Sequence, residues 1–315
     1  EHNLINLASK KAEEFVSNKD PNLHYLGLTM MTRLMQISTR VIAEYRTIIT
    51  SCLENTDPAC VLLAVDLLHT IATPQTIGDF VDHLLEQIQK RPQGTIRDIM
   101  VDRTIQLCTH NNYERVTDFE WYILVLCELH NLGSKSPRIP EEIRMIALRL
   151  PPARPAIVAE MLPILQNPFG EPSDLIETAA FIVGEYSEDE EVFSYLTSNS
   201  IKGMPPSAQA ACLQNAFKLF CRSPVDGELQ ERVDKIVELF NDFATSRFAE
   251  VADRALLYGR LCESYKKDPE PEICSFFFEE QLKAVHPSAQ SRLKPPETLN
   301  ISQCITNLEA IDSDL

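Results

Sequence analysis

Hydrophobic residues recur every three or four positions along almost the whole chain, with polar residues between them. This spacing places the hydrophobic residues on one face of an α-helix. Four clear stripes are Leu23, Leu26, Met30 and Leu34; Ile42, Tyr45, Ile49, Cys52 and Leu53; Val61, Ala64, Val65, Leu68 and Ile71; and Phe80, Leu84, Leu85 and Ile88. No pair of alternating segments joined by a tight turn predicts a β-hairpin. The pattern therefore predicts an all-α protein.

The helices are predicted to come in pairs. Asp20-Pro21 and Asp57-Pro58 each precede a stripe. Asp is a good N-cap, and Pro suits the first helical position because its missing N–H would be unpaired there. The two starts are 37 residues apart, near the period of HEAT and armadillo repeats. The spacing favours a HEAT/armadillo-like α-solenoid of paired antiparallel helices, with a globular helical bundle as the alternative.

Proline- and glycine-rich breaks divide the pattern at 133–140, 151–155, 167–172, 203–206 and 268–271. Helical patterning resumes after each break, so these segments are predicted to be loops between helices. After His286 the chain becomes polar and proline-rich, which is typical of extended structure. We therefore predict a solenoid over 1–285 and an extended exit over 286–315. The chain begins without Met inside an amphipathic pattern, so we expect it to be a section of a larger protein.

The charge balance argues against several classes of partner. The 315 residues carry 46 acidic and 29 basic side chains, a formal net charge of −17. Such a surface repels nucleic acid and anionic lipid headgroups. The 9 cysteines are scattered without a CxxC pair, which is typical of small core residues in a reduced cytosolic protein. No apolar run approaches the 18 or so residues of a transmembrane helix.

Motifs for catalysis or ligand binding are missing from the sequence. It has no GxxxxGK[ST], GxGxxG, GxSxG or HExxH, and its 7 histidines are dispersed. The acidic run Ser187–Phe193 lacks the ligand spacing of a calcium loop. Its Ser187 and Glu190 fit a capping box at a helix start instead. We therefore predict no catalytic, cofactor-binding or metal-binding residues, no cofactor and no small-molecule substrate.

The stretch VTDFEWY contains the single tryptophan and two carboxylates, which suggests an acidic site. Thr117 and Glu120 fit a capping box, with Asp118 in the first turn, where the helix dipole favours an anion. Trp121 is then placed to pack against Val116 as a hydrophobic staple. Residues two apart on a helix point about 200° away from each other, so the two acids do not converge. We predict a structural helix start here.

Two stretches resemble the trunks of adaptins, the large subunits of heterotetrameric clathrin-adaptor complexes. AAFIVGEYSE is similar to their hallmark of an aromatic residue followed by Gly-Glu and Tyr or Phe, and LQNAFKLF resembles the helix that follows it. DFEWYILVLCEL is similar to the delta type, the large subunit of adaptor protein complex 3. The likeness covers essentially the whole chain and implies the C-terminal half of the trunk. The motif residues are Phe119, Glu120, Trp121 and Tyr122, with Phe181, Gly184, Glu185 and Tyr186.

The resemblance implies a non-enzymatic scaffold of a vesicle coat that sorts cargo from Golgi or endosomes to the lysosome or vacuole. Its implied partners are the beta, medium (mu) and small (sigma) subunits. An Arf-family GTPase and the membrane would be engaged through the whole complex, which is cytoplasmic and peripheral on Golgi and endosomal membranes. The family's sigma contact and cargo groups lie mainly in the N-terminal half of the trunk, so no cargo-binding residue is assigned.

Two other functions fit parts of the sequence. One is another HEAT-repeat transport scaffold, either coatomer-like or a different adaptin type; the Phe119–Tyr122 motif speaks against it. The other is an acidic all-α enzyme, which requires a deep pocket with converging polar groups.

Overall fold

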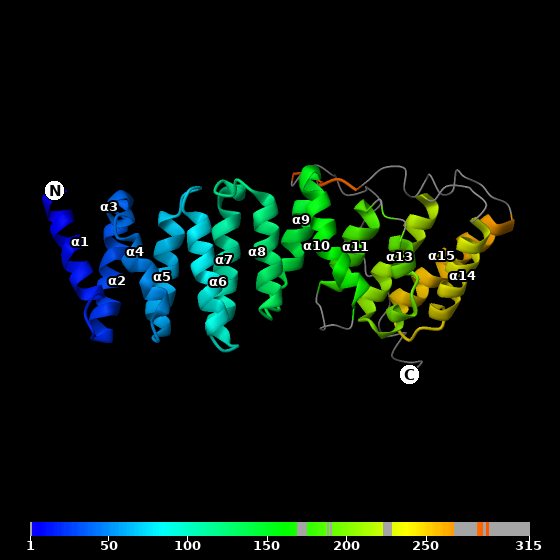
Figure 1. Ribbon diagram of the computed structural model, residues 1–315, viewed down its shortest axis with the longest axis horizontal. Helices are drawn as coiled ribbons and strands as arrows, with labels where there is room; N and C mark the ends of the chain where they lie inside the picture. Colours follow the sequence, from blue (N-terminus) through cyan, green and yellow to red (C-terminus); the bar gives the residue numbers. More distant parts are fainter. Residues whose placement is uncertain are drawn as a thin grey trace, which may run out of the picture. The chain divides into compact units, whose positions relative to one another are not determined.

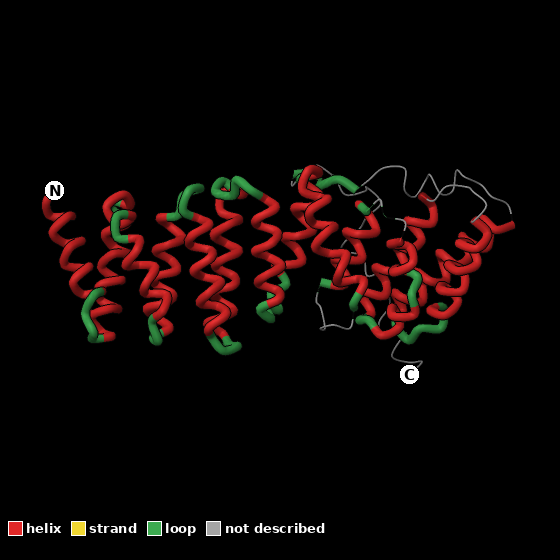
Figure 2. Tube along the Cα trace, viewed as in Figure 1, coloured by secondary structure: helices red, strands yellow, loops and turns green. Residues whose placement is uncertain are grey.

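The computed structural model describes residues 2–168, 175–187, 189, 191–222, 229–267, 282–285 and 288–289. Within these residues every regular element is a helix, as Figure 2 shows, and the all-α prediction is confirmed. The helices are α1 (His2–Val16), α2 (Pro21–Met35), α3 (Thr39–Ala43), α4 (Arg46–Ser51), α5 (Pro58–Ile71), α6 (Ile77–Lys90), α7 (Thr95–Tyr113), α8 (Phe119–Asn131), α9 (Arg138–Arg149), α10 (Arg154–Gln166), α11 (Ile176–Tyr186), α12 (Glu191–Leu196), α13 (Pro206–Arg222), α14 (Leu229–Phe243) and α15 (Ala249–Lys267).

The chain divides into two compact units, Glu1–Leu282 and Lys283–Leu315. In the first unit the helices follow one another along the array from α1 in blue, mostly in chain order, and α15 packs between α13 and α14 (Figure 1). Each helix packs on its neighbours: α1 on α2, α2 on α5, α6 on α7, α10 on α11, α11 on α13, and α13 and α14 on α15. This arrangement is the predicted α-solenoid. Most of 286–315 lies outside the described residues, so the predicted extended exit stays a prediction.

One continuous layer of buried apolar side chains runs through the first unit, from Ala12 on α1 to Tyr265 on α15. The predicted stripe Val61, Ala64, Val65, Leu68 and Ile71 on α5 is buried in it. On α2 the predicted face is wrong: Leu28 and Met31 are buried, whereas Leu26 of the predicted stripe is 44% exposed. Among the described residues, the largest fully buried side chains are Tyr122, Phe217 and Phe240. Because each helix has its partners in neighbouring elements, the stability of such an array is a sum of local interfaces.

The two Asp-Pro helix starts are confirmed. Asp20 accepts a hydrogen bond from the Asn22 amide at 2.9 Å, and Asp57 accepts one from the Ala59 amide at 3.1 Å. Pro21 and Pro58 each begin the helix that follows. The break predicted at 151–155 begins as a 3₁₀ turn, Pro151–Ala153, between α9 and α10. The predicted break at 268–271 lies outside the described residues.

The predicted start of α8 is wrong by one residue. The N-cap is Asp118, whose Oδ1 accepts from the Glu120 amide at 2.9 Å and from the Trp121 amide at 3.2 Å. The capping box of Thr117 and Glu120 is therefore incorrect, because Glu120 now stands at the second helical position rather than the third. Asp caps a helix more strongly than Thr, and here it takes the amides assigned to Thr117.

The helix after the acidic run also begins later than predicted. It starts at Glu191, whose amide donates to Asp189 Oδ1 at 2.9 Å. Ser187 Oγ accepts from the Asp189 amide at 3.1 Å, so it stabilises the turn before the helix. Glu190, the other predicted box residue, lies outside the described residues.

Candidate functional site

Gly184 lies at a close approach of α11 and α13. A Cβ built on Gly184 would come 2.4 Å from the Asn215 Cβ on α13. Asn215 has little room to withdraw, because it is buried and its Nδ2 donates to the Ala211 carbonyl at 2.8 Å. Glycine is thus the residue that allows this helix crossing, which explains one position of the adaptin-like motif.

The next motif residue, Glu185, places a carboxylate in the interface between α11 and α13. Its side chain has an exposed fraction of 0%. Lys218 Nζ contacts Oε2, and Arg222 Nη2 lies 3.2 Å from Oε1. Arg222 Nη1 also donates to the Glu185 carbonyl at 2.8 Å. Burial, followed by the charge of Arg222, lowers the pKa of Lys218 to about 8. A carboxylate in such surroundings requires these cations as partners.

Tyr186 completes the motif at the C-terminal end of α11. The Arg154 guanidinium from α10 lies 4.2 Å from the centre of its ring, a distance at which cation–π attraction is effective. Phe181 contacts the same ring edge-on, with the ring centres 6.3 Å apart. Burial raises the pKa of Tyr186, and the charges of Arg154 and Arg222 oppose that shift.

Glu185 and Tyr186 together hold the main chain of a residue far away in the sequence. The Leu282 amide donates to Glu185 Oε1 at 3.0 Å, and Tyr186 Oη donates to the Leu282 carbonyl at 3.4 Å. We call Glu185, Tyr186, Lys218 and Arg222 the Glu185 cluster. It joins α11, α13 and the chain segment at Leu282.

The second predicted motif forms an aromatic cluster at the junction of α7 and α8. Tyr122 is fully buried, and Phe119 packs edge-on against Tyr113 with ring centres 5.5 Å apart. Tyr113 Oη donates to Glu142 Oε2 on α9 at 2.6 Å. Burial is the main cause that raises the pKa values of Tyr113 and Tyr122. Trp121 is half-buried against the core, and Glu120 is exposed.

The turn before this cluster has an unusual backbone. Asn111, Asn112 and Tyr113 have φ values of 46°, 59° and 65°, which lie in the left-handed region. Each such non-glycine residue costs about 1–2 kcal/mol relative to a right-handed conformation, and Asn bears it best. The Tyr113 contacts with Phe119 and Glu142 hold this turn in place.

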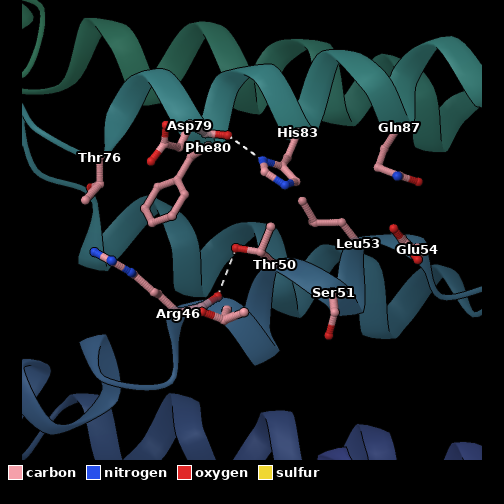
Figure 3. Close-up of a pocket in the computed structure, with 11 residues that line it drawn as sticks. Arg46, Thr50, Ser51, Leu53, Glu54, Thr76, Asp79, Phe80, His83 and Gln87 are labelled. Carbon is pink, nitrogen blue, oxygen red and sulfur yellow. Dashed lines mark hydrogen bonds between the residues drawn. The ribbon is translucent and has the colours of Figure 1, made fainter.

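Among the clefts in the described part of the chain, one lies between α4 and α6, and another crosses α9, α11, α13 and α15. The first, of about 310 Å³, is lined by polar side chains of α4 and α6. In Figure 3, Arg46 lies on the α4 side of this cleft, and Asp79 and His83 lie on the α6 side. His83 Nδ1 lies 2.7 Å from the Asp79 carbonyl, and Thr50 Oγ1 donates to the Arg46 carbonyl at 2.9 Å. Both are bonds within a single helix, so neither joins the two sides of the cleft.

The second cleft, of about 500 Å³, crosses α9, α11, α13 and α15. Met145, Leu148 and Phe181 are among the apolar residues lining it. Two charged pairs border it: Arg144 with Glu177 at 3.5 Å, and Arg254 with Glu250 at 2.7 Å. An apolar floor with polar borders is the general composition of a protein contact surface.

The cysteines of the described helices are core residues. Burial is the largest cause of the rise in thiol pKa, to about 11 for Cys52 and about 12 for Cys60, Cys108, Cys127 and Cys212. Within the described ranges, no group of three or more His, Cys, Asp or Glu side chains could hold a metal ion. No helix in that part of the chain is long and apolar enough to cross a membrane.

The structure brings Gly184, Glu185 and Tyr186 into one site, and Phe119 and Tyr122 into another. Sequence reasoning missed the residues that complete them: Asn215, Lys218, Arg222, Arg154, Leu282, Tyr113 and Glu142. One signal was present for α13: Lys218 and Arg222 stand at i and i+4 among apolar residues of LQNAFKLF and the residues after it. Cations placed beside an apolar helix face require an anionic partner.

Comparison with known proteins gives consistent matches. The family model described as Adaptin N terminal region matches residues 1–266. The AP-3 complex subunit delta-1 of Bos taurus is 27% identical over 327 residues, covering 96% of this chain and 27% of that protein. The AP-3 complex subunit delta of Dictyostelium discoideum is 26% identical over 352 residues, covering 96% of this chain and 31% of that protein. The chain thus spans about a third or less of the length of these relatives.

The fold also has a structural counterpart. A chain in a homology model of the full-length AP-3 complex in an intermediate open conformation matches with a TM-score of 0.68 and 20% identity. The match covers 85% of this chain and 54% of that chain. At this identity the likeness shows the fold, an α-solenoid.

The expected position within the parent protein needs correction. The matching family model describes the N-terminal region of adaptins, so the assignment to the C-terminal half of the trunk is wrong. Motifs such as the Gly184–Tyr186 stretch identify a repeat but carry no information on its distance from either end of a longer chain. The sigma contact was expected to lie outside the chain because of that assignment, so this expectation no longer holds. With residues 1–266 matched, the chain belongs to the adaptin N-terminal region family.

Proposed function

We propose that this chain is a scaffold section of a delta-type large subunit in a heterotetrameric adaptor complex of the AP-3 kind. In this role it has no catalytic activity. It supplies a solenoid on which the beta, medium and small subunits assemble, and the complex sorts cargo from Golgi or endosomes to the lysosome or vacuole. An Arf-family GTPase and the membrane engage the whole complex, which is cytoplasmic and peripheral on Golgi and endosomal membranes.

The observation that carries this proposal is the family match together with the names of the relatives. Adaptins are structural subunits of coats, and the family model covers residues 1–266. The relatives from Bos taurus and Dictyostelium discoideum are both delta subunits of AP-3 complexes, and each match covers 96% of this chain. The delta-like DFEWY stretch forms the aromatic cluster at the start of α8, so the subtype signal lies in a packed part of the fold.

The structure offers surfaces suited to subunit contacts. The cleft across α9, α11, α13 and α15 has an apolar floor bordered by charged pairs. An interface of this kind discriminates between partners through its charges and gains affinity from its apolar centre. The formal net charge of −17 supports indirect membrane engagement, because an acidic surface is repelled by anionic lipids.

Coexpression tests the assignment. The full-length protein that contains this chain is produced with the beta, medium and small subunits of AP-3 and purified through a tag on itself. We expect all four chains in equal amounts in one peak on size-exclusion chromatography. Absence of all three partners would overturn the proposal.

Parallel coexpressions separate the alternatives. The same protein is produced with the AP-1 partner subunits, with the AP-2 partner subunits, and with coatomer subunits. AP-2 and AP-1 are the relevant adaptin controls because the AP-2 alpha-1 and AP-1 gamma-2 subunits of Arabidopsis thaliana also match this chain, at 22% and 21% identity. Preferential assembly with any of these sets would replace the AP-3 assignment with that alternative.

A further inference from the structure

The contact at Leu282 differs from ordinary helix packing because it is made through the main chain. The amide donates to Glu185 Oε1 at 3.0 Å, and the carbonyl accepts from Tyr186 Oη at 3.4 Å. The Leu282 side chain is 47% exposed, and Val285 just beyond it is 71% exposed. The main chain of Leu282 is therefore held by two hydrogen bonds, while about half of the residue stays exposed.

The electrostatics of the Glu185 cluster explain why a peptide N–H fits there. An ionised carboxylate offers about four acceptor positions. Lys218 contacts Oε2, and Arg222 approaches Oε1 at 3.2 Å, which leaves room at Oε1 for another donor. Hydrogen bonds to a charged acceptor are stronger than those between neutral groups. The side chain of Glu185 is fully buried, so an added donor also helps to satisfy a carboxylate that water cannot reach.

Tyr186 is held so that its hydroxyl can donate a hydrogen bond to the Leu282 carbonyl. Its ring is fixed between the Arg154 guanidinium at 4.2 Å and the Phe181 ring. Burial raises the pKa of its hydroxyl, which keeps the proton available for donation. A donor and an acceptor from adjacent residues of α11 thus face the main-chain N–H and C=O of one residue, Leu282.

We propose that Glu185 and Tyr186, supported by Lys218, Arg222 and Arg154, form a binding site for extended main chain, and that the chain's own residue 282 occupies it. The first compact unit ends at Leu282. The site therefore anchors the main chain at the last residue of the first unit. Because it recognises peptide groups, it tolerates a change of side chain at 282 but not the loss of the amide hydrogen.

Limited proteolysis with trypsin after Lys283 tests this inference. Trypsin must draw several residues around the cleaved bond into its active site, so a pinned Leu282 slows cleavage. The measured quantity is the protection ratio, the cleavage rate in urea-denatured protein divided by the rate in native protein. Using this ratio removes the effect of each substitution on trypsin's own preference.

Matched variants separate main-chain capture from side-chain packing. Leu282→Ala keeps the amide hydrogen, and we expect its protection ratio to stay within about twofold of the wild-type value. Leu282→Pro removes the amide hydrogen, and we expect the ratio to fall at least about tenfold, the effect of losing a hydrogen bond to a charged group. Tyr186→Phe keeps the ring and the contact with Arg154 but loses the hydroxyl, and we expect a fall of about threefold.

The outcomes are distinct. Equal protection in Leu282→Ala and Leu282→Pro would overturn the proposal, as would a wild-type protein that trypsin cleaves as fast as its denatured form. An unchanged ratio in Tyr186→Phe would remove Tyr186 from the site. Circular dichroism on each variant confirms that the helices are intact. Failure of the AP-3 coexpression would leave this result unaffected, because the test uses one chain alone.

Discussion

At the scale of single residues, Gly184 decides how closely α11 and α13 can approach. A Cβ at 184 would lie 2.4 Å from Asn215 Cβ, whereas a Cβ at Gly78 on α6 would meet nothing within 4 Å. Both glycines lie inside helices, where Ala is intrinsically favoured over Gly. The two positions therefore make a matched pair in which packing and helix propensity have opposite effects.

We predict that Gly184→Ala lowers the free energy of unfolding by about 1–3 kcal/mol, because the added methyl overpacks the helix crossing. Gly78→Ala is expected to raise it by about 0.5–1 kcal/mol through helix propensity alone. Urea unfolding followed by circular dichroism measures both. If Gly184→Ala proves neutral, the motif glycine does not set the helix crossing.

The buried cysteines give a second residue-scale prediction. Cys60, Cys108 and Cys212 have thiol pKa values of about 12, and the thiolate is the reactive form. At pH 8.5 we expect them to react with iodoacetamide at least about 100-fold more slowly in the native protein than in urea. Mass spectrometry of the peptides measures the rates. Similar rates in both states would contradict their burial.

The same thiols affect stability at alkaline pH. Their folded pKa values lie above the ordinary value of 9.0. Between about pH 9 and 12 the unfolded chain therefore binds fewer protons than the folded chain, and the free energy of unfolding falls as pH rises.

At the scale of elements, the start of α8 shows how one residue sets a helix boundary. Asp118 Oδ1 accepts from two amides, those of Glu120 and Trp121. We predict that Asp118→Ala lowers the free energy of unfolding by about 1 kcal/mol, the usual effect of losing an N-cap. Thr117→Ala is the matched control and should change it by less than half as much. Equal losses in the free energy of unfolding for the two substitutions would support Thr117 as an N-cap of α8.

The sequence predicted elements well and their contacts poorly. The Asp-Pro starts of α2 and α5 and the break at Pro151 follow from the preferences of a few adjacent residues. The left-handed turn at Asn111–Tyr113 could not be predicted in this way. The conformational free energy that it requires is offset by contacts of Tyr113 with Phe119 and Glu142. The motif residues were placed by resemblance, and their structural role stays a prediction that the Gly184 variant tests.

At the scale of the whole molecule, the described helices of the first unit pack mainly on elements near them along the chain. Because each helix packs on near neighbours, a substitution that destabilises one helix interface should leave the stability of distant helices unchanged. We predict that Gly184→Ala increases amide hydrogen exchange in α11 and α13 while leaving α2 and α5 unchanged. Exchange read by mass spectrometry checks this. A uniform increase over all helices would show that the first unit unfolds as one cooperative body.

The sequence by itself determined the all-α class, the helical stripes and the likeness to adaptins. These depend on hydrophobic spacing and capping, which act over a few neighbouring residues. Only the tertiary structure decided that Glu185 meets Lys218 and Arg222, and that Leu282 joins them. Those partners are 33, 37 and 97 residues away from Glu185, and the first two contact it where α11 and α13 cross closely beside Gly184. Local patterns do not encode that crossing, since it depends on the packing of both helix surfaces at once.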